Sequence, residues 1–341
     1  MSSMSSNLTL SRIPEVSADW QLKDYLGTIR VRSSIGRNSY LVKPGLYQLG
    51  SPDSSSEVFV SANYKLSFDI LRKNLAGINA WILVLDTKGV NVWCAAGKDT
   101  FGTDELIRQI NLTDLKNLIT HRRLIVPQLG APGVSAHLVK LSTGFNVRFG
   151  PVRASDIKEY LANSYKKDDK LRSVNFNLKD RLLLIPVEIM NSLKQFLLIS
   201  LFFIALSGIT SSGYSFQTLL KQGSEAFIYL LAAYISGAAL TPAFLPWLPF
   251  RSFAGKGMVA TTIVFIGFLV SGFTEQFLLL PLGYYLISLA ISSFLAMNFT
   301  GASTYTSLSG VKKEMNFFVP IQIALTTIGL ILVIVSKFIY F

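Results

Sequence analysis

The charged residues of this chain are distributed very unevenly along its 341 residues. Residues 1–181 contain 25 Lys and Arg and 16 Asp and Glu, whereas residues 182–341 contain only 7 and 4. A segment with so few charges cannot present a water-soluble surface, and a helix of about 20 apolar residues is long enough to cross a bilayer. The second half is therefore predicted to be an all-α transmembrane domain that follows a water-soluble domain.

Five apolar stretches in the second half have about the length that a membrane-spanning helix needs. They cover approximately Gln195–Gly213, Ala226–Pro246, Gly257–Phe273, Phe277–Met297 and Phe317–Lys337. Pro242 and Pro281 are expected to kink their helices or to mark helix ends, and Thr274–Gln276 to form a tight hairpin. Essentially no ionisable residue lies between the ends of these spans, which argues against a transporter. We interpret this half as an anchor and docking platform, with passage of a soft metal as the weaker alternative.

Basic residues indicate the orientation of the chain in the membrane. If the N-terminal domain is cytoplasmic, the inner loops hold Arg251, Lys256, Lys312 and Lys313, and the outer loops hold only Lys221. This distribution agrees with the positive-inside rule, and the first 25 residues lack the apolar run of a signal peptide. We therefore predict a cytoplasmic domain over residues 1–165 and a multi-pass transmembrane domain over residues 195–341 in the cytoplasmic (inner) membrane. The basic segment between them, residues 166–194, either contacts anionic lipid head groups or is a solvated linker.

The first half of the chain alternates predicted strands and helices. Apolar runs at Val58–Val60, Ala80–Leu85 and Leu124–Val126 predict strands, and Tyr64–Leu75 has helical periodicity. Further helices are expected at residues 104–110 and 115–119. Continuous apolar strands that alternate with helices are typical of an α/β doubly wound, Rossmann-like parallel sheet.

In such a fold the ligand lies outside the carboxyl ends of the strands. The three loops that follow the predicted strands contain Asn63, Cys94 and Gln128. We therefore predict that these residues line one crevice, although they are distant in sequence.

Cys94 is the only cysteine of the chain and lies in the run Asn91-Val-Trp-Cys-Ala-Ala-Gly-Lys98. A lone cysteine acts singly, as a thiolate nucleophile or as one ligand to a metal. Asn91 is a good N-cap for a short helix, which places Cys94 near the positive end of the helix dipole, where a thiolate is favoured. The alternative is that Cys94 is a small buried residue, as most free cysteines are.

The residues after Cys94 predict a smooth surface beside the thiol. Ala95 and Ala96 have almost no side chain, so a planar group can approach the helix closely. Gly97 is expected to end the helix in the left-handed conformation, and Lys98 adds a positive charge beyond it.

The run Asn91–Lys98, followed by Thr100-Phe-Gly-Thr103, resembles the signature of the mercury-methylating corrinoid protein family. That family joins a cytoplasmic corrinoid-binding domain to a membrane domain, and the resemblance extends over essentially the whole chain. The soluble part is similar, more distantly, to the corrinoid-binding domain of the corrinoid iron–sulfur protein large subunit. The resemblance implies that Cys94 lies on a cap helix and is the lower axial ligand to cobalt. Asp99 stands where many members of the family carry glycine.

The resemblance also implies an activity, a corrinoid-dependent methyltransferase. A methyl group passes from methyl-cobalt(III) corrinoid to inorganic Hg(II) and gives methylmercury, and an electron-rich thiolate opposite the methyl stabilises the Co(III) that remains. The Hg(II) substrate is expected to arrive bound to thiols, and the methyl donor to come from the folate-linked pathway. The implied partner is a membrane-associated ferredoxin with two 4Fe–4S clusters, because one cysteine cannot hold a cluster. No nucleic acid is expected to bind.

Two further loops are candidates for contact with the corrinoid. Residues 61–63 resemble a cofactor-facing loop of the corrinoid iron–sulfur protein, and residues 128–131 occupy a turn that in the family contacts the corrin rim and nucleotide tail. Gly130 and Gly133, three positions apart, do not form a dinucleotide-binding fingerprint, and a plain turn is the alternative. The candidate cofactor-binding residues are therefore Asn91, Val92, Trp93, Cys94, Ala95, Ala96, Gly97, Lys98, Ser61, Ala62, Asn63, Gln128, Leu129, Gly130 and Ala131.

Neither histidine of the chain carries the usual cobalamin signature Asp-x-His-x-x-Gly. His121 is interpreted as a solvated helix end, and His137, expected before a strand, as an edge histidine with satisfied partners. Two other functions stay open. One is a membrane-anchored corrinoid methyl carrier of one-carbon metabolism with a different acceptor, and the other is a non-enzymatic sensor or scaffold in which Cys94 is merely buried.

Overall fold

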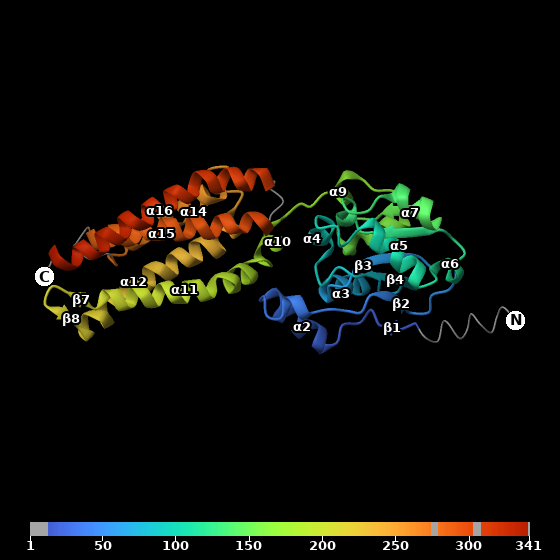
Figure 1. Cartoon of the computed structure of the whole chain (residues 1–341), viewed down its shortest axis with the longest axis horizontal. Coiled ribbons are helices and arrows are strands. Elements are labelled where there is room, and N and C mark those ends of the chain that lie inside the picture. The colour runs from blue at the N-terminus through green and yellow to red at the C-terminus, as the bar shows by residue number, and fades with distance from the viewer. Residues whose placement is uncertain (1–12, 274–278, 303–307, 340–341) are drawn as a thin grey trace. The chain divides into compact units, whose positions relative to one another are not determined.

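A mixed six-stranded sheet forms the centre of the first part of the chain (Figure 1). The computed structural model describes residues 13–273, 279–302 and 308–339. The chain divides into an N-terminal unit, residues 1–174, and a C-terminal unit, residues 175–341. The order of the strands is β1-β2-β4-β3-β5-β6. Their bounds are β1 Glu15–Val16, β2 Gly45–Leu49, β3 Val58–Ala62, β4 Ala80–Leu85, β5 Arg123–Val126 and β6 Asn146–Phe149.

The prediction of a parallel sheet is confirmed for four strands and wrong for one edge. Strands β4, β3, β5 and β6 are parallel, whereas β2 pairs antiparallel with β4 and carries β1 outside it. Only residues 50–57 connect β2 to β3. This connection is too short for the crossover that two parallel strands require.

Helices cover both faces of the sheet, because successive side chains of the buried strands point to opposite sides. Val58 and Val60 pack in a core with helices α4 to α7, whereas Phe59 packs in a second core with α3 and α8. The helices of this unit are α2 Leu22–Arg32, α3 Lys65–Asn74, α4 Val92–Ala96, α5 Thr103–Leu112, α6 Leu115–Leu118, α7 Ala136–Thr143, α8 Ile157–Ala162 and α9 Asp169–Arg172. Short 3-10 turns cover Arg37–Ser39, Gln128–Gly130 and Ala154–Asp156.

His137, expected before a strand, lies in helix α7, and the strand that follows is β6. Ser135 caps this helix, since its side chain accepts a hydrogen bond from the backbone N–H of Leu138, and Gly144 ends it in the left-handed conformation. Both caps are local signals that outweigh the short apolar pattern of the segment.

A buried ion cluster joins α2 to α3. The Nζ of Lys65 lies 2.9 Å from Asp24 and 2.5 Å from Asp69, and the Arg72 guanidinium lies 2.9 and 2.8 Å from the same two carboxylates. Asp69 is 0% exposed and Asp24 is 2% exposed. Each buried carboxylate therefore meets two cations, which offsets its loss of hydration.

The cluster predicts a loss of stability in acid. Burial by itself raises the pKa of Asp24, but hydrogen bonds from Lys65, the Gln21 backbone N–H and Arg72 outweigh it and lower the pKa from 3.8 to about 2. A group with a lowered pKa stabilises the fold above its ordinary pKa, and that stability is lost as the pH falls through the lowered value. Urea unfolding of the full chain should therefore lose about 2 kcal/mol between about pH 4 and about pH 2 from this group alone. An Asp24→Asn chain should show a drop smaller by that amount, and an unchanged drop would contradict the assignment.

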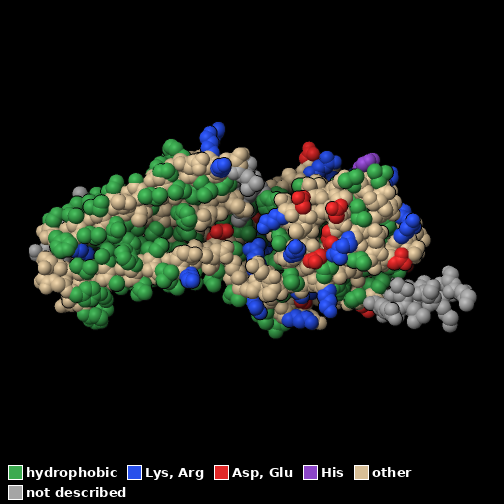
Figure 2. Space-filling view, viewed as in Figure 1, with side chains coloured by type: hydrophobic (Ala, Val, Ile, Leu, Met, Phe, Trp, Pro, Cys, Tyr) green, Lys and Arg blue, Asp and Glu red, His purple; other side chains and the backbone are tan. Residues whose placement is uncertain are grey.

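The C-terminal unit is helical, and five of its helices are long and apolar enough to cross a membrane, as predicted. They cover Leu178–Ser207, Phe216–Phe244, Phe253–Val270, Leu279–Gly301 and Ser309–Ile339. Figure 2 shows apolar side chains over the surface of this unit, whereas Lys, Arg, Asp and Glu gather on the N-terminal unit. Its elements are α10 Leu178–Leu182, α11 Ile185–Ser207, β7 Ile209–Thr210, β8 Gly213–Tyr214, α12 Phe216–Ile235, the π-helical segment Ser236–Leu240, α13 Thr241–Phe244, α14 Phe253–Val270, α15 Leu279–Asn298, the 3-10 turn Phe299–Ala302 and α16 Leu308–Ile339.

Small residues bring these helices close together. A Cβ atom on Gly237 or Gly257 would lie 2.7 or 2.5 Å from the Ser292 carbonyl oxygen, and one on Gly283 would lie 2.9 Å from the Gly329 oxygen. Glycine is thus required where backbones meet, as is common between membrane helices.

Both prolines singled out in the sequence lie at irregular positions. Pro242 follows the π-helical segment directly, and Pro281 lies in the first turn of α15. Pro320, inside α16, was not anticipated. The hairpin predicted at Thr274–Gln276 lies outside the described residues.

The predicted apolar runs contain no Lys, Arg, Asp or Glu except Lys337 at the end of the fifth, but the helices are longer than these runs. The helices extend beyond the apolar runs and include Glu188, Glu225, Lys256 and Glu314. Lys337 is buried, and its Nζ donates to the Ser207 carbonyl oxygen at 3.2 Å and to the Gln222 side chain. A helix that is longer than its apolar run includes the charged residues that flank the run.

Candidate functional site

The order in which the parallel strands are added to the sheet reverses between β3 and β5. The chain leaves β3 to form β4 on one side and then returns to place β5 on the other side. The carboxyl ends of strands at such a switch point are where α/β sheets bind ligands. A pocket of about 360 Å³ lies here.

Three of the predicted loops contribute to this pocket. Five of the fifteen candidate residues line it, which are Ser61, Asn91, Val92, Trp93 and Leu129. The loops converge as predicted, but none of the three residues expected to line the crevice, Asn63, Cys94 and Gln128, lines this pocket. The opposite wall was missed, because it comes from residues after β6, where the sequence carried no polar or motif signal. These residues are Gly150, Pro151, Val152, Ala154 and Ile157.

The short helix predicted for the cysteine run is confirmed. Helix α4 covers Val92–Ala96, and the Asn91 Oδ1 atom accepts a hydrogen bond of 3.0 Å from the backbone N–H of Cys94. Asn91 is thus the N-cap, and it fixes the start of the helix on which the thiol is carried.

Cys94 is exposed, which overturns the alternative that it is a buried structural residue. The predicted smooth surface is also revised, because Ala95 and Ala96 point inward and pack in the core with Val92. The exposed face of the helix is formed instead by Trp93, which is 42% exposed, Cys94, and then Gly97 and Lys98. The alanines therefore seat the helix on the domain rather than face a ligand.

Gly97 does not end the helix in the left-handed conformation. Its φ is −73°, and the left-handed residue is Asp99, with φ +58°. Asp is one of the few side chains that tolerate this region.

Asp99→Gly is therefore expected to raise the free energy of unfolding by about 0.5–1 kcal/mol, because glycine adopts positive φ without steric cost. Urea unfolding of the full chain measures this effect. Asp99→Val should lower stability instead, since a β-branched residue is strongly disfavoured there. If both variants unfolded like the parent chain, the strain assigned to Asp99 would be absent.

Asn63 does not face the pocket as predicted. It is 4% exposed, its Nδ2 donates to Asp86, and its Oδ1 accepts from Thr87 N–H, Thr87 Oγ1 and Gly89 N–H at 2.8–3.1 Å. Asn63 thereby holds the loop 86–90 that leads into α4. Of its neighbours, Ala62 is fully buried, and Ser61 lines the pocket while its hydroxyl donates to the Ala62 carbonyl oxygen.

The loop that contains residues 128–133 packs against α4 and the residues that follow it. A Cβ on Gly130 would meet the ring of Phe101, and one on Gly133 would meet the Phe101 oxygen and lie 3.1 Å from the Cα of Ala96. These glycines allow a close approach between the loop and the cysteine helix, which the alternative of a plain turn does not describe. The role of Phe101, fully buried beneath them, was missed in the sequence.

The remaining residues of that loop are placed as follows. Leu129 lines the pocket, and Ala131 is half-buried. The Gln128 Oε1 atom accepts a hydrogen bond of 2.5 Å from Lys167. Burial, with repulsion from Arg172, lowers the pKa of Lys167.

Among the described residues, no group of three or more His, Cys, Asp or Glu side chains is arranged to hold a metal ion. His121 is half-buried and lies 3.0 Å from the Ser56 oxygen, so it has a structural partner and is not a solvated helix end. His137 is exposed on α7. Cys94 therefore stands alone as a soft ligand on this face.

Cys94 and the pocket lie within a part of the chain that is similar to a known protein family. Residues 25–161 match the family described as CdhD, CO dehydrogenase/acetyl-CoA synthase delta subunit. This match includes Cys94 and every residue that lines the pocket, and it excludes the five apolar helices.

Three relatives are named acetyl-CoA decarbonylase/synthase complex subunit gamma. The protein of Methanopyrus kandleri is 33% identical over 122 residues, which are 35% of this chain and 26% of the relative. That of Archaeoglobus fulgidus is 29% identical over 143 residues (40% and 30%), and that of Methanocaldococcus jannaschii is 26% identical over 150 residues (43% and 30%). The chain thus spans less than a third of the length of these relatives. Its N-terminal unit is similar to a subunit of the acetyl-CoA decarbonylase/synthase complex, and it carries Cys94 within the shared region.

Proposed function

We propose that this chain is a membrane-anchored, corrinoid-dependent methyltransferase that transfers a methyl group to Hg(II), and that Cys94 would hold the cobalt of the corrinoid. The observation that carries the proposal is the exposure of the single cysteine on a capped helix beside the switch-point pocket. Similarity to a subunit of a complex named for acetyl-CoA decarbonylation and synthesis supports one-carbon chemistry at this site. The resemblance of the run Asn91–Lys98 to the signature of the mercury-methylating corrinoid protein family supports Hg(II) as the acceptor.

The residues on this face fit a large planar ligand. Cys94 and Gly97 lie three positions apart and therefore on one side of the helix. A Cβ on Gly97 would meet nothing closer than 3.8 Å, so the surface beside the thiol is open. The adjoining pocket, which shares Asn91 to Trp93 with the cysteine helix, has room for a side group of the same ligand.

The chain's own residues supply ligation and position. Cys94 donates electron density as a thiolate, Asn91 holds the start of its helix, and Asn63 holds the loop before it. When bound, a corrinoid would supply the methyl group that is transferred. Because the chain has no second cysteine, Hg(II) is delivered as a complex with thiols from outside.

The membrane arrangement and the partners belong to the same proposal. The five apolar helices anchor residues 1–165 on the cytoplasmic side of the inner membrane, through a basic segment that faces lipid head groups. A two-cluster ferredoxin supplies electrons, and the methyl group derives from the folate-linked pathway.

The test is an anaerobic assay of the full chain loaded with methylcobalamin and supplied with a Hg(II)–thiol complex. We expect methylmercury to form in an amount equal to the methyl group lost. A second candidate, a methyl carrier with another acceptor, is favoured by the similarity over residues 25–161. Loss of the methyl group to a different acceptor, with no methylmercury formed, would decide for that candidate.

Gly97→Leu tests the open face directly. A leucine there is expected to fill the space beside the thiol and to weaken corrinoid binding roughly tenfold or more, because a planar ligand can no longer approach. Equilibrium dialysis of the full chain against cobalamin measures the affinity. Gly267→Leu adds the same side chain at another open position, on α14, and should bind cobalamin like the parent chain. Equal affinity of the Gly97→Leu chain would place the ligand elsewhere.

A further inference from the structure

A large cavity of about 1150 Å³ lies within the C-terminal unit, between helices α11, α12, α15 and α16. This volume exceeds the range of about 300–1,000 Å³ that is usual for small-molecule sites. The cavity has a polar and an apolar end, which together indicate the kind of molecule that fits.

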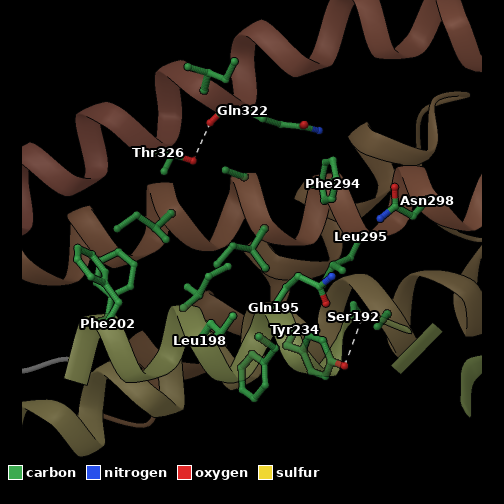
Figure 3. A pocket seen from close by; sticks show the side chains of 18 of the residues that line it. Ser192, Gln195, Leu198, Phe202, Tyr234, Phe294, Leu295, Asn298, Gln322 and Thr326 are labelled. Atoms are coloured by element: carbon green, nitrogen blue, oxygen red, sulfur yellow. Dashed lines mark hydrogen bonds between the residues drawn. The ribbon is translucent and has the colours of Figure 1, made fainter. Parts of the chain in front are cut away.

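Four carboxamide side chains of described residues line the cavity; one is that of Asn191, and the other three mark the polar end. Figure 3 shows Gln195 of α11, Asn298 of α15 and Gln322 of α16 with their amides toward the same end. Gln322 is 6% exposed, and its Nε2 donates 2.9 Å to the Ser293 hydroxyl. The side chains of Gln195 and Asn298 make no hydrogen bond to any other described residue. Both residues are exposed, so their amides, which lack a partner in the described part of the chain, lie on the open surface of this apolar unit, and an amide that meets acyl chains there loses free energy unless a ligand satisfies it.

The apolar end begins one turn further along α11. Leu198 and Phe202 extend from Gln195 over roughly 10 Å of helix, at 1.5 Å per residue. They are 59% and 54% exposed, and Ile323 on α16 is 62% exposed. These values show that the cavity is open on the side between α11 and α16, which would face acyl chains if these helices cross a bilayer.

The described lining of the cavity contains no positively charged side chain, which disfavours an anionic head group. Glu188 is the only charged residue among the described residues around the cavity, and neither Lys nor Arg lines it. An anionic phospholipid head would find no cation there. A neutral head group with carbonyl or hydroxyl oxygens matches the three amides, which both donate and accept hydrogen bonds.

We propose that this cavity binds a neutral membrane amphiphile. Its head group accepts hydrogen bonds from Gln195, Asn298 and Gln322, and its apolar chain follows Leu198 and Phe202 toward the open side. The cavity lies wholly within residues 175–341, so the proposal is independent of the chemistry at Cys94.

Binding of a decyl-substituted benzoquinone to the full chain in phosphatidylcholine nanodiscs tests the proposal. We expect one saturable site, and affinities roughly tenfold weaker in Gln195→Leu and in Asn298→Leu, as for the loss of one hydrogen bond. Gln217→Leu makes the same change at an exposed position of α12 outside the cavity, and should bind like the parent chain.

A second variant tests whether weaker binding comes from the cavity itself or from misfolding after the loss of an amide. Thr327→Phe adds volume at the apolar end without removing an amide, and it should abolish saturable binding. Phosphatidylglycerol added to the nanodiscs should not compete. Unsaturable partition that is equal in all variants, or displacement of the quinone by the anionic lipid, would overturn the proposal.

Discussion

Cys94→Ala is expected to reduce Hg(II) methylation by the full chain at least about a hundredfold, because no other residue on this face can replace a thiolate ligand. The absorption spectrum of bound cobalamin should change in parallel, since a residue that holds the metal tunes its electronic state. Cys94→Ser should behave similarly, because a hydroxyl is a much poorer soft-metal ligand than a thiolate.

Two controls separate ligation from folding in this experiment. The Cys94 side chain is exposed, so the alanine variant should unfold at the same urea concentration as the parent chain. His137→Ala removes an exposed imidazole from α7 and should leave methylation and the cobalamin spectrum unchanged. A Cys94→Ala chain with the parental spectrum would refute thiolate ligation, and one that still methylates Hg(II) would refute the catalytic role of the thiolate.

Gly133→Val is expected to be the most damaging change outside the thiol itself. A Cβ at this position meets the backbone oxygen of Phe101 and lies 3.1 Å from the Cα and O atoms of Ala96. Neither contact is a flexible side chain, so either the loop or α4 has to move. Overpacking of this kind costs about 3 kcal/mol.

The displacement should also be visible in function. Movement of α4 shifts Cys94, and catalytic geometry tolerates only small shifts, so corrinoid binding should weaken together with stability. Urea unfolding and cobalamin dialysis of the full chain measure the two effects. Gly97→Ala provides the stability control, because its Cβ would meet only backbone atoms at 3.8–3.9 Å. If the Gly133→Val chain were as stable as the Gly97→Ala chain, the loop would accommodate the valine without cost, and the predicted overpacking would be wrong.

Strands and membrane helices could be predicted well from the sequence because burial on both sides leaves long apolar runs. Ala80–Leu85 was predicted with the bounds of β4, and the five apolar stretches correspond to five helices. Strand β2 was not predicted, and its direction depends on the length of its connection to β3 and not on residue type.

At the site, the N-cap of α4 was predictable because Asn91 acts on a residue three positions away. The inward direction of Ala95 and Ala96 was not, since small residues suit a buried face and an open one equally. Asn63 was misplaced for a related reason. An amide after a strand serves a ligand or a loop equally well, and only the positions of Thr87 and Gly89 decide between them.

The four hydrogen bonds of the Asn63 side chain have a consequence for binding. They order the loop before α4 when the chain folds, so this segment loses little further conformational entropy when a ligand arrives. Affinity at such a preorganised site depends on contacts made rather than on freedom lost. The cysteine helix is therefore best regarded as a rigid support whose position precedes, and does not follow, the arrival of the ligand.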